Sequence, residues 1–206
     1  MPTVTALRED RRGRVAVELD GTAWRTVPVD VVVRAGLAEG RALDRPALRL
    51  LRRELRRAEA LAVAGRALRT RDMSRRRLAE RLERAVDPAA AKESLAALSG
   101  AGLVDDGRFA RARAEGLAGR GYGDAAIRHD LERQGVDAEL AEDALTELEP
   151  ELERARRLVE RRGGGLRTAR YLSSKGFGGE ALELAAGPDF EAVGDDLPPV
   201  TDLDGA

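Results

Sequence analysis

The sequence lacks most of the residues on which enzyme and metal sites depend. It contains no cysteine, which excludes disulfides, thiolate metal sites and cysteine nucleophiles. Its one histidine, His129, falls in the middle of an expected helix between Arg128 and Asp130, where we expect it to face solvent. We find no pair of acidic residues with convergent spacing beside a Gly-rich or metal-ligand motif. The sequence therefore predicts a protein that is not an enzyme and that needs no cofactor or metal.

Long apolar runs are absent as well. No stretch approaches the length of a membrane-spanning helix, and residues 1–14 lack the apolar core of a secretory signal. We therefore expect a cytoplasmic protein without a membrane partner. Aromatic residues make up only 3% of the chain, so alanine, leucine and valine must build the core. Such a core suits closely packed helices better than a bulky β-sandwich.

Charge is abundant, nearly balanced and unevenly placed. Thirty-six basic residues face 37 acidic residues, and Lys92 and Lys175 are the only lysines. Almost all the positive charge is therefore arginine, whose planar guanidinium makes bidentate contacts with phosphates and carboxylates. Basic residues dominate from Arg45 to Arg84, whereas every charged residue from Asp189 on is acidic. The near-zero net charge therefore conceals a chain whose charge is polarised along its length.

Residues 105–145 predict three short helices in succession. Asp105 and Asp106 offer carboxylates to the start of the first helix, the Gly121–Gly123 segment ends it, and Gly135 ends the second. Helical spacing gives the expected apolar stripes, which are Phe109, Ala112, Gly116 and Leu117, then Ile127 and Leu131, then Leu140, Ala141, Ala144, Leu145 and Leu148. The remaining expectations are that Asp137 caps the third helix and that Arg128, Asp130, Glu132 and Arg133 point outward.

Internal repeats extend this plan to the flanking chain. Leu78 and Leu82 match Ile127 and Leu131 at an offset of 49 residues (78 to 127), and Leu131 to Ala144 match Leu172 to Ala185 at an offset of 41 (131 to 172). Each unit has too little apolar surface to be stable alone and must pack against its neighbour. The sequence therefore predicts a mainly α fold of three tandem three-helix repeats, elongated and curved, after a small N-terminal β-hairpin extension.

The β-like region covers residues 3–27. Apolar residues alternate along 15–19, Asp20-Gly21 is a strong hairpin-turn signal, and a short helix at 30–35 should end at Gly36. A lone hairpin is marginally stable, so we expect Trp24 to anchor it on this helix or on the helical body. The expected domains are 1–43 for the hairpin and short helix, 44–104, 105–149 and 150–187 for the three repeats, and 188–206 for an acidic disordered tail.

Arginines concentrate at two helix starts of the first repeat. The helix that begins after Asp44 carries Arg49, Arg52, Arg53, Arg56 and Arg57, which fit either a solvated helix face or a footprint for nucleic acid or an acidic protein. Ser74 should cap the next helix, whose first residues are three arginines; cations there oppose the helix dipole at a cost of a few tenths of a kcal/mol each. A bound phosphate or a partner carboxylate would relieve that conflict. The candidate nucleic-acid or partner contacts are Arg75, Arg76, Arg77, Arg120, Arg128, Arg167 and Arg170.

Several of these motifs resemble one protein family. Residues 105–110, Asp-Asp-Gly-Arg-Phe-Ala, resemble the acid-acid-x-x-Phe-Ala signature of the bacterial RecX regulatory proteins. The glycines at 121–123, followed by Ile127, Leu131 and Gly135, resemble the spaced Gly-Ile-Leu-Gly pattern of the same family, and residues 71–82 resemble its first repeat. The residues expected to be structural within these motifs are Asp105, Asp106, Phe109, Ile127, Leu131 and Gly135.

The resemblance implies a modulator of the RecA recombinase. Members of the family are tandem three-helix repeat proteins that engage RecA filaments on DNA and restrain recombination in DNA repair and the SOS response. The implied partners are the RecA filament and single- and double-stranded DNA, and we expect the protein to act as a monomer. The alternative from a different class is a general helical-repeat DNA-binding adaptor without a recombinase partner.

Overall fold

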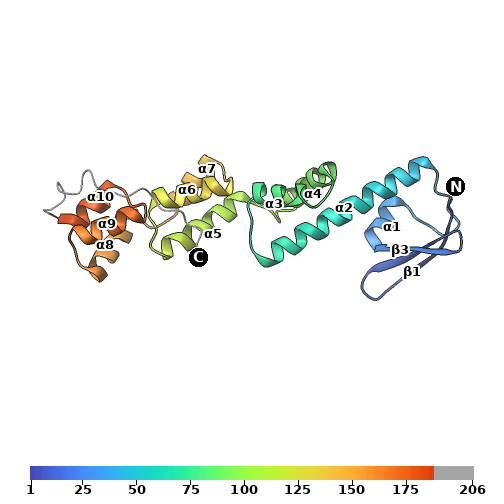
Figure 1. Ribbon diagram of the computed structural model, residues 1–206, viewed down its shortest axis with the longest axis horizontal. Coiled ribbons are helices and arrows are strands. Elements are labelled where there is room, and N and C mark those ends of the chain that lie inside the picture. The colour runs from blue at the N-terminus through green and yellow to red at the C-terminus, as the bar shows by residue number, and fades with distance from the viewer. Residues whose placement is uncertain (188–206) are drawn as a thin grey trace. The chain divides into compact units, whose positions relative to one another are not determined.

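The structure is a computed structural model that describes residues 1–187, so the expected tail at 188–206 lies outside the described residues. The chain forms two compact units. Unit 1 contains Met1–Asp72 and Leu78–Leu103, and unit 2 contains Met73–Arg77 and the chain from Val104 on. The predicted mainly α fold with a small N-terminal sheet is confirmed (Figure 1).

The sheet of unit 1 has three antiparallel strands in the order β1 (Val4–Glu9), β2 (Arg14–Leu19) and β3 (Thr22–Pro28). The predicted hairpin is β2–β3, and β1 adds a further strand to its other edge. Asp20 and Gly21 form its turn with positive φ angles of 50° and 77°, which suit a tight hairpin. The short helix α1 (Val29–Ala35) packs on this sheet and ends at Gly36 in the left-handed conformation, as predicted.

The expectation that Trp24 anchors the hairpin is wrong. Its side chain is 41% exposed. Trp24 is the extra residue of a bulge in β3, because Ala23 pairs with Glu18 and Arg25 pairs with Val17. Aliphatic side chains hold the sheet instead, in a buried cluster that contains Val4, Val15, Val17, Val27, Val31, Ala35, Leu37, Leu43, Ala47 and Leu51.

The helices of unit 1 begin where the sequence predicts. The long helix α2 (Arg45–Thr70) begins after Asp44, whose Oδ1 accepts the N–H of Ala47 at 2.8 Å. It packs against both α1 and α4 (Pro88–Gly100). The helix α3 (Arg75–Glu83) precedes α4 and begins in unit 2. Small residues of α2, among them Ala60 and Ala64, are fully buried, which allows neighbours to approach closely.

Unit 2 contains two helical trios (Figure 1). The first is α5 (Asp106–Gly119), α6 (Asp124–Gln134) and α7 (Ala138–Thr146), and the second is α8 (Glu151–Arg162), α9 (Leu166–Ser174) and α10 (Gly179–Ala186). Each trio has its own apolar cluster, with Ile127 and Leu131 fully buried in the first and Leu172 fully buried in the second. None of the helices from residue 1 to 187 combines the length and apolarity that crossing a membrane requires.

Several expected side-chain positions within unit 2 are wrong. Ala112 and Gly116 are exposed, because the buried stripe of α5 runs through Ala110 and Ala114 instead. Asp137 stands at the N-cap of α7 but makes no capping hydrogen bond with its side chain. His129 is exposed, as expected.

Asp130, predicted to point outward, is fully buried. Arg113 of α5 binds it with two guanidinium nitrogens, the Nη2–Oδ1 pair at 2.8 Å, and Arg133 lies 3.7 Å away. A polar residue beside an apolar stripe can turn inward when a cation of the next helix faces it, and helical spacing cannot show that cation.

Candidate functional site

The predicted cluster of Arg75, Arg76 and Arg77 lies where the start of α3 meets the end of α6, within unit 2. Asp106 accepts the backbone N–H of Arg75 at 2.6 Å, and Ser74 Oγ donates to the carbonyl of Gln134 at 2.5 Å. Asp106 therefore caps α3 and not its own helix. Asp105 alone caps α5, because its Oδ1 accepts the N–H of Arg108 at 2.9 Å, a bond that holds the pKa of Asp105 below its ordinary value.

The carboxylate that offsets the three cations at the start of α3 is thus supplied by the chain itself. Arg77 is half-buried and donates to the carbonyl of Arg133 at 3.1 Å and to the side chain of Gln134 at 3.2 Å. Arg75 and Arg76 have exposed side chains. The stem of Arg76 covers Gly135, where a Cβ would overlap it. Of the three arginines, Arg77 has a structural role at the end of α6.

The same arrangement recurs at the start of α6, with the repeat offsets found in the sequence. Glu151 Oε1 accepts the N–H of Asp124 at 2.6 Å, as Asp106 accepts that of Arg75, 49 residues earlier. The N–H of Gly123 donates to the carbonyl of Lys175 at 2.8 Å, 41 residues after the carbonyl that Ser74 binds. We call these two regions the α3 junction and the α6 junction. Sequence reasoning missed Glu151, because nothing in its neighbourhood shows which helix it caps.

Arg154 is the second residue that sequence reasoning missed. It is 6% exposed, and it donates to the carbonyls of Tyr122 at 2.8 Å and Glu149 at 3.0 Å. It also forms an ion pair with Asp124, and its guanidinium lies 5.9 Å from the ring centre of Phe177. Arg154 follows Glu151 by three residues, as Phe109 follows Asp106, so an arginine occupies the position of an aromatic residue.

The other four predicted contact residues lie on α6, on α9 and directly after α5. Arg128 is bound by Glu142, with one nitrogen–oxygen pair at 3.1 Å, and this contact raises the pKa of Arg128 and lowers that of Glu142. Arg120 follows α5, and Arg167 and Arg170 lie on α9; all three are exposed and have no ion pair within residues 1–187. The seven predicted arginines therefore form three groups. Residues 75–77 lie at the α3 junction, Arg128 is paired with Glu142, and Arg120, Arg167 and Arg170 are exposed without an ion pair in the described chain.

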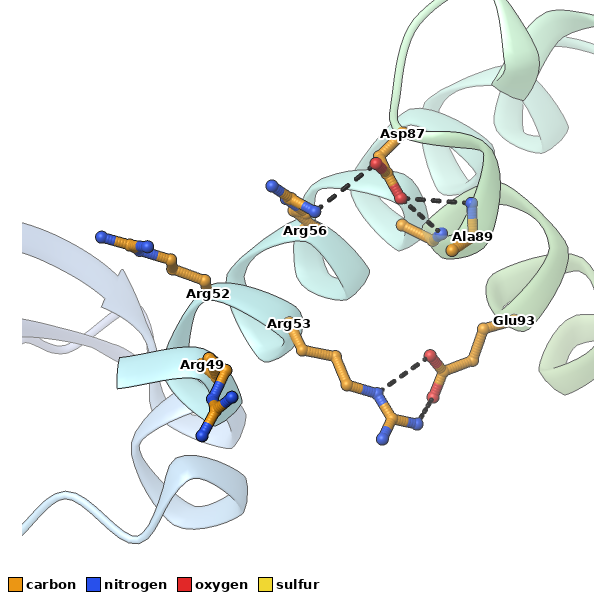
Figure 2. Close-up of a pocket in the computed structure, with 8 residues that line it drawn as sticks. Arg49, Arg52, Arg53, Arg56, Asp87, Ala89 and Glu93 are labelled. Carbon is orange, nitrogen blue, oxygen red and sulfur yellow. Dashed lines mark hydrogen bonds and ion pairs between the residues drawn. The ribbon is translucent and has the colours of Figure 1, made fainter. Parts of the chain in front are cut away.

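A fourth arginine cluster lies in unit 1, in a groove of about 330 Å³ between α2 and α4 (Figure 2). Arg53 binds Glu93 through two nitrogens at 2.8 and 3.3 Å, and Arg56 lies 3.4 Å from Asp87. The Arg53 contact lowers the pKa of Glu93, and Glu93 raises that of Arg53. The full lining is Arg49, Arg52, Arg53, Arg56, Asp87, Ala89, Ala90 and Glu93.

The spacing of these arginines along α2 is the only signal of the groove that the sequence offers. The sequence indicated a footprint along α2, but not that α4 places two carboxylates opposite it. Chemically, the groove and the exposed arginines of unit 2 offer guanidinium donors to anions. Within the described residues, no cluster of histidine, aspartate or glutamate is arranged to hold a metal ion.

The fold and these clusters define a helical-repeat protein with arginine-rich surfaces. A family model described as "RecX, second three-helix domain" matches residues 105–145. A "Regulatory protein RecX" of Xanthomonas oryzae pv. oryzae (strain PXO99A) is 34% identical over 132 residues, which are 59% of this chain and 82% of that protein. One of Streptomyces coelicolor is 36% identical over 159 residues, covering 67% of this chain and 85% of the relative.

Solved structures share the fold. A crystal structure of regulatory protein RecX superposes with a TM-score of 0.74 at 22% identity and covers 89% of this chain and 98% of its own. The crystal structure of RecX from Lactobacillus salivarius gives 0.55 at 18% identity, over 67% and 96%. The chain belongs to the RecX family, which is a family of regulatory proteins and not a known enzyme family.

Proposed function

We propose that this protein binds the RecA filament on DNA and restrains its activity in recombination and DNA repair. The observation that carries the proposal is membership of the RecX family together with arginines that have no internal partner within residues 1–187. Such side chains can bind DNA phosphates or an acidic filament surface without first breaking an ion pair. We place this action in the cytoplasm, by a monomer.

The proposed contacts are the seven arginines predicted from the sequence. The geometry separates them by availability. Arg120, Arg167 and Arg170 are exposed without an ion pair in the described chain, whereas Arg77 and Arg128 must leave an internal partner first. We therefore expect the exposed arginines to make the larger contribution to binding.

The test is RecA ATP hydrolysis on single-stranded DNA with increasing amounts of this protein. We expect hydrolysis to fall with added protein, and we expect an Arg167→Gln, Arg170→Gln double variant to require more protein for the same effect. Arg11→Gln is the matched control, because Arg11 is an exposed arginine of the β1–β2 turn in unit 1. Hydrolysis that stays unchanged at any amount of protein would reject the proposal.

A general DNA-binding adaptor remains the second candidate, favoured by the abundance of exposed arginine alone. A pull-down with RecA filaments against naked DNA separates the two, because an adaptor should bind both equally. In either case binding should weaken with salt, with a slope of about −0.7 to −0.9 in log K against log salt per phosphate contact.

A further inference from the structure

The groove between α2 and α4 in unit 1 has four arginines on one wall and two carboxylates on the other. Arg49, Arg52, Arg53 and Arg56 are all exposed and follow one another at helical spacing. With a rise of ~1.5 Å per residue, the row extends for roughly 10 Å along α2. The row is therefore long enough to contact more than one charge of a linear polyanion.

The arginines of this row differ in their engagement. Figure 2 shows Arg53 directed at Glu93 and Arg56 at Asp87, while the side chains of Arg49 and Arg52 extend from α2 without such a partner. Arg49 and Arg52 have no ion pair among residues 1–187. Two positions of the groove are thus open to an anion, and two already hold a carboxylate.

We propose that this groove binds the phosphodiester backbone of single-stranded DNA, and that Asp87 and Glu93 compete with the phosphates for Arg56 and Arg53. The inference takes DNA as the ligand from the proposed function. Exposed ion pairs are weak because water screens them, so a phosphate can replace either carboxylate. The bidentate guanidinium contact that Glu93 receives is the one that a phosphate oxygen pair would receive.

The lining favours a phosphodiester over an acidic peptide. Apart from the arginines and carboxylates, the groove is lined only by Ala89 and Ala90. A bound peptide needs pockets for apolar anchors, and two methyl groups offer none. The lining contains no aromatic residue on which bases could stack, so binding should depend on phosphates and show little sequence preference.

The experiment measures binding of the full-length protein to fluorescent oligo-dT over a series of salt concentrations. Arg49→Gln with Arg52→Gln should reduce the salt slope by roughly 1.4, which is two single-strand contacts of about 0.7 each. Glu93→Gln should increase affinity, because it frees Arg53, and Asp87→Asn should do the same while an asparagine still caps α4. Arg66→Gln is the matched control, an exposed arginine of α2 outside the groove.

Three results would overturn the inference. One is a double arginine variant that loses no more affinity than Arg66→Gln, and another is a pair of carboxylate variants whose affinity matches the wild type. The third is unchanged oligo-dT binding with weaker inhibition of RecA ATP hydrolysis, which would assign the groove to a protein partner. Normal groove effects on oligo-dT without any inhibition of RecA would instead reject the proposed function and leave the groove assignment standing.

Discussion

The α3 junction and the α6 junction join helices in the same geometry with different chemistry. In both, a carboxylate from a following helix accepts the first backbone N–H of the joined helix, from Asp106 in one and Glu151 in the other. Both also contain a left-handed glycine at the end of the opposing helix, Gly135 with φ 80° and Gly176 with φ 79°. The shared features are therefore a carboxylate that caps a backbone N–H and a glycine with a left-handed backbone.

The remaining contacts differ. The α3 junction uses the side chains of Ser74 and Arg77 to reach the end of α6, whereas the α6 junction brings Gly123 directly onto the backbone of Gly176. The comparison teaches that the repeat is maintained by helix caps and backbone approach, while the side chains around them can change. This explains why the repeats are recognisable by the spacing of a few residues only.

The largest expected effect is the loss of stability on truncating the side chains at two equivalent positions, Phe109 and Arg154. Phe109→Ala should lower the free energy of unfolding by about 3 to 5 kcal/mol through lost burial and a cavity. Arg154→Ala should cost about 3 kcal/mol, because it leaves the carbonyls of Tyr122 and Glu149 and the carboxylate of Asp124 without their donor. Urea unfolding followed by circular dichroism measures both. A Phe109→Ala protein with an unchanged midpoint but lost RecA inhibition would make Phe109 a contact residue.

The next effect tests the close approach at the two glycines, Gly123 and Gly135. Gly123→Ala should cost about 3 kcal/mol, because the added Cβ overlaps the backbone of Gly176 and Phe177, which cannot move aside easily. Gly135→Ala should cost about as much, because its Cβ overlaps the Cβ of Arg76, which no rotamer change can move, and its backbone is left-handed. Gly119→Ala is the control, because a Cβ there meets nothing within 4 Å. A cost at 123 or at 135 no larger than that of Gly119→Ala would contradict the close approach at that junction.

A smaller effect concerns the two capping carboxylates. Glu151 also accepts the N–H of Gly178 at 2.9 Å, so it serves two helix starts, whereas Asp106 serves the start of α3. Glu151→Ala should therefore cost about 2 kcal/mol and Asp106→Ala about 1 kcal/mol. Amide hydrogen exchange can test this locally, with faster exchange expected at Asp124 and Gly178 in the first variant and at Arg75 in the second. Unchanged exchange at these amides would argue against the caps.

The smallest effect is a pH dependence that separates α5 from α8. Asp105 caps α5 and has a lowered pKa, whereas Pro150 at the equivalent place before α8 offers no side-chain cap. A lowered folded pKa adds stability above the ordinary pKa of aspartate, about 3.9, and this stability is lost as pH falls through the folded pKa. On acidification the start of α5 should therefore loosen before the start of α8. NMR spectra recorded as the pH is lowered measure this, from the amide signals at the start of α5 and at the start of α8. Asp105→Asn is the comparison, because it has no carboxyl group to protonate at this position.

Much of the fold could be predicted, because its signals are local. Asp44 and Asp105 begin helices where the sequence places them, and Gly36 and Gly135 end helices in the left-handed conformation. The domain boundaries at 44, 105 and 150 stay predictions.

The candidate site was harder to predict, because its signals lie between distant residues. Asp130 turns inward only because Arg113 comes from another helix, and Asp106 caps a helix that begins 31 residues earlier. Trp24 is carried outward by a bulge that no alternation pattern shows. Which arginines are open and which are engaged depends on carboxylates that the fold brings from elsewhere in the chain.

The cap that Asp106 provides for Arg75 also has a practical consequence for dividing the protein. A fragment that starts at residue 105 would keep all six helices of unit 2, but it would remove Ser74 and Arg77 from the end of α6. Gln134 and Gly135 would then face solvent at a surface shaped for another helix. Truncations meant to isolate the C-terminal trios should therefore begin before Met73, even though such a fragment also contains α3 and α4.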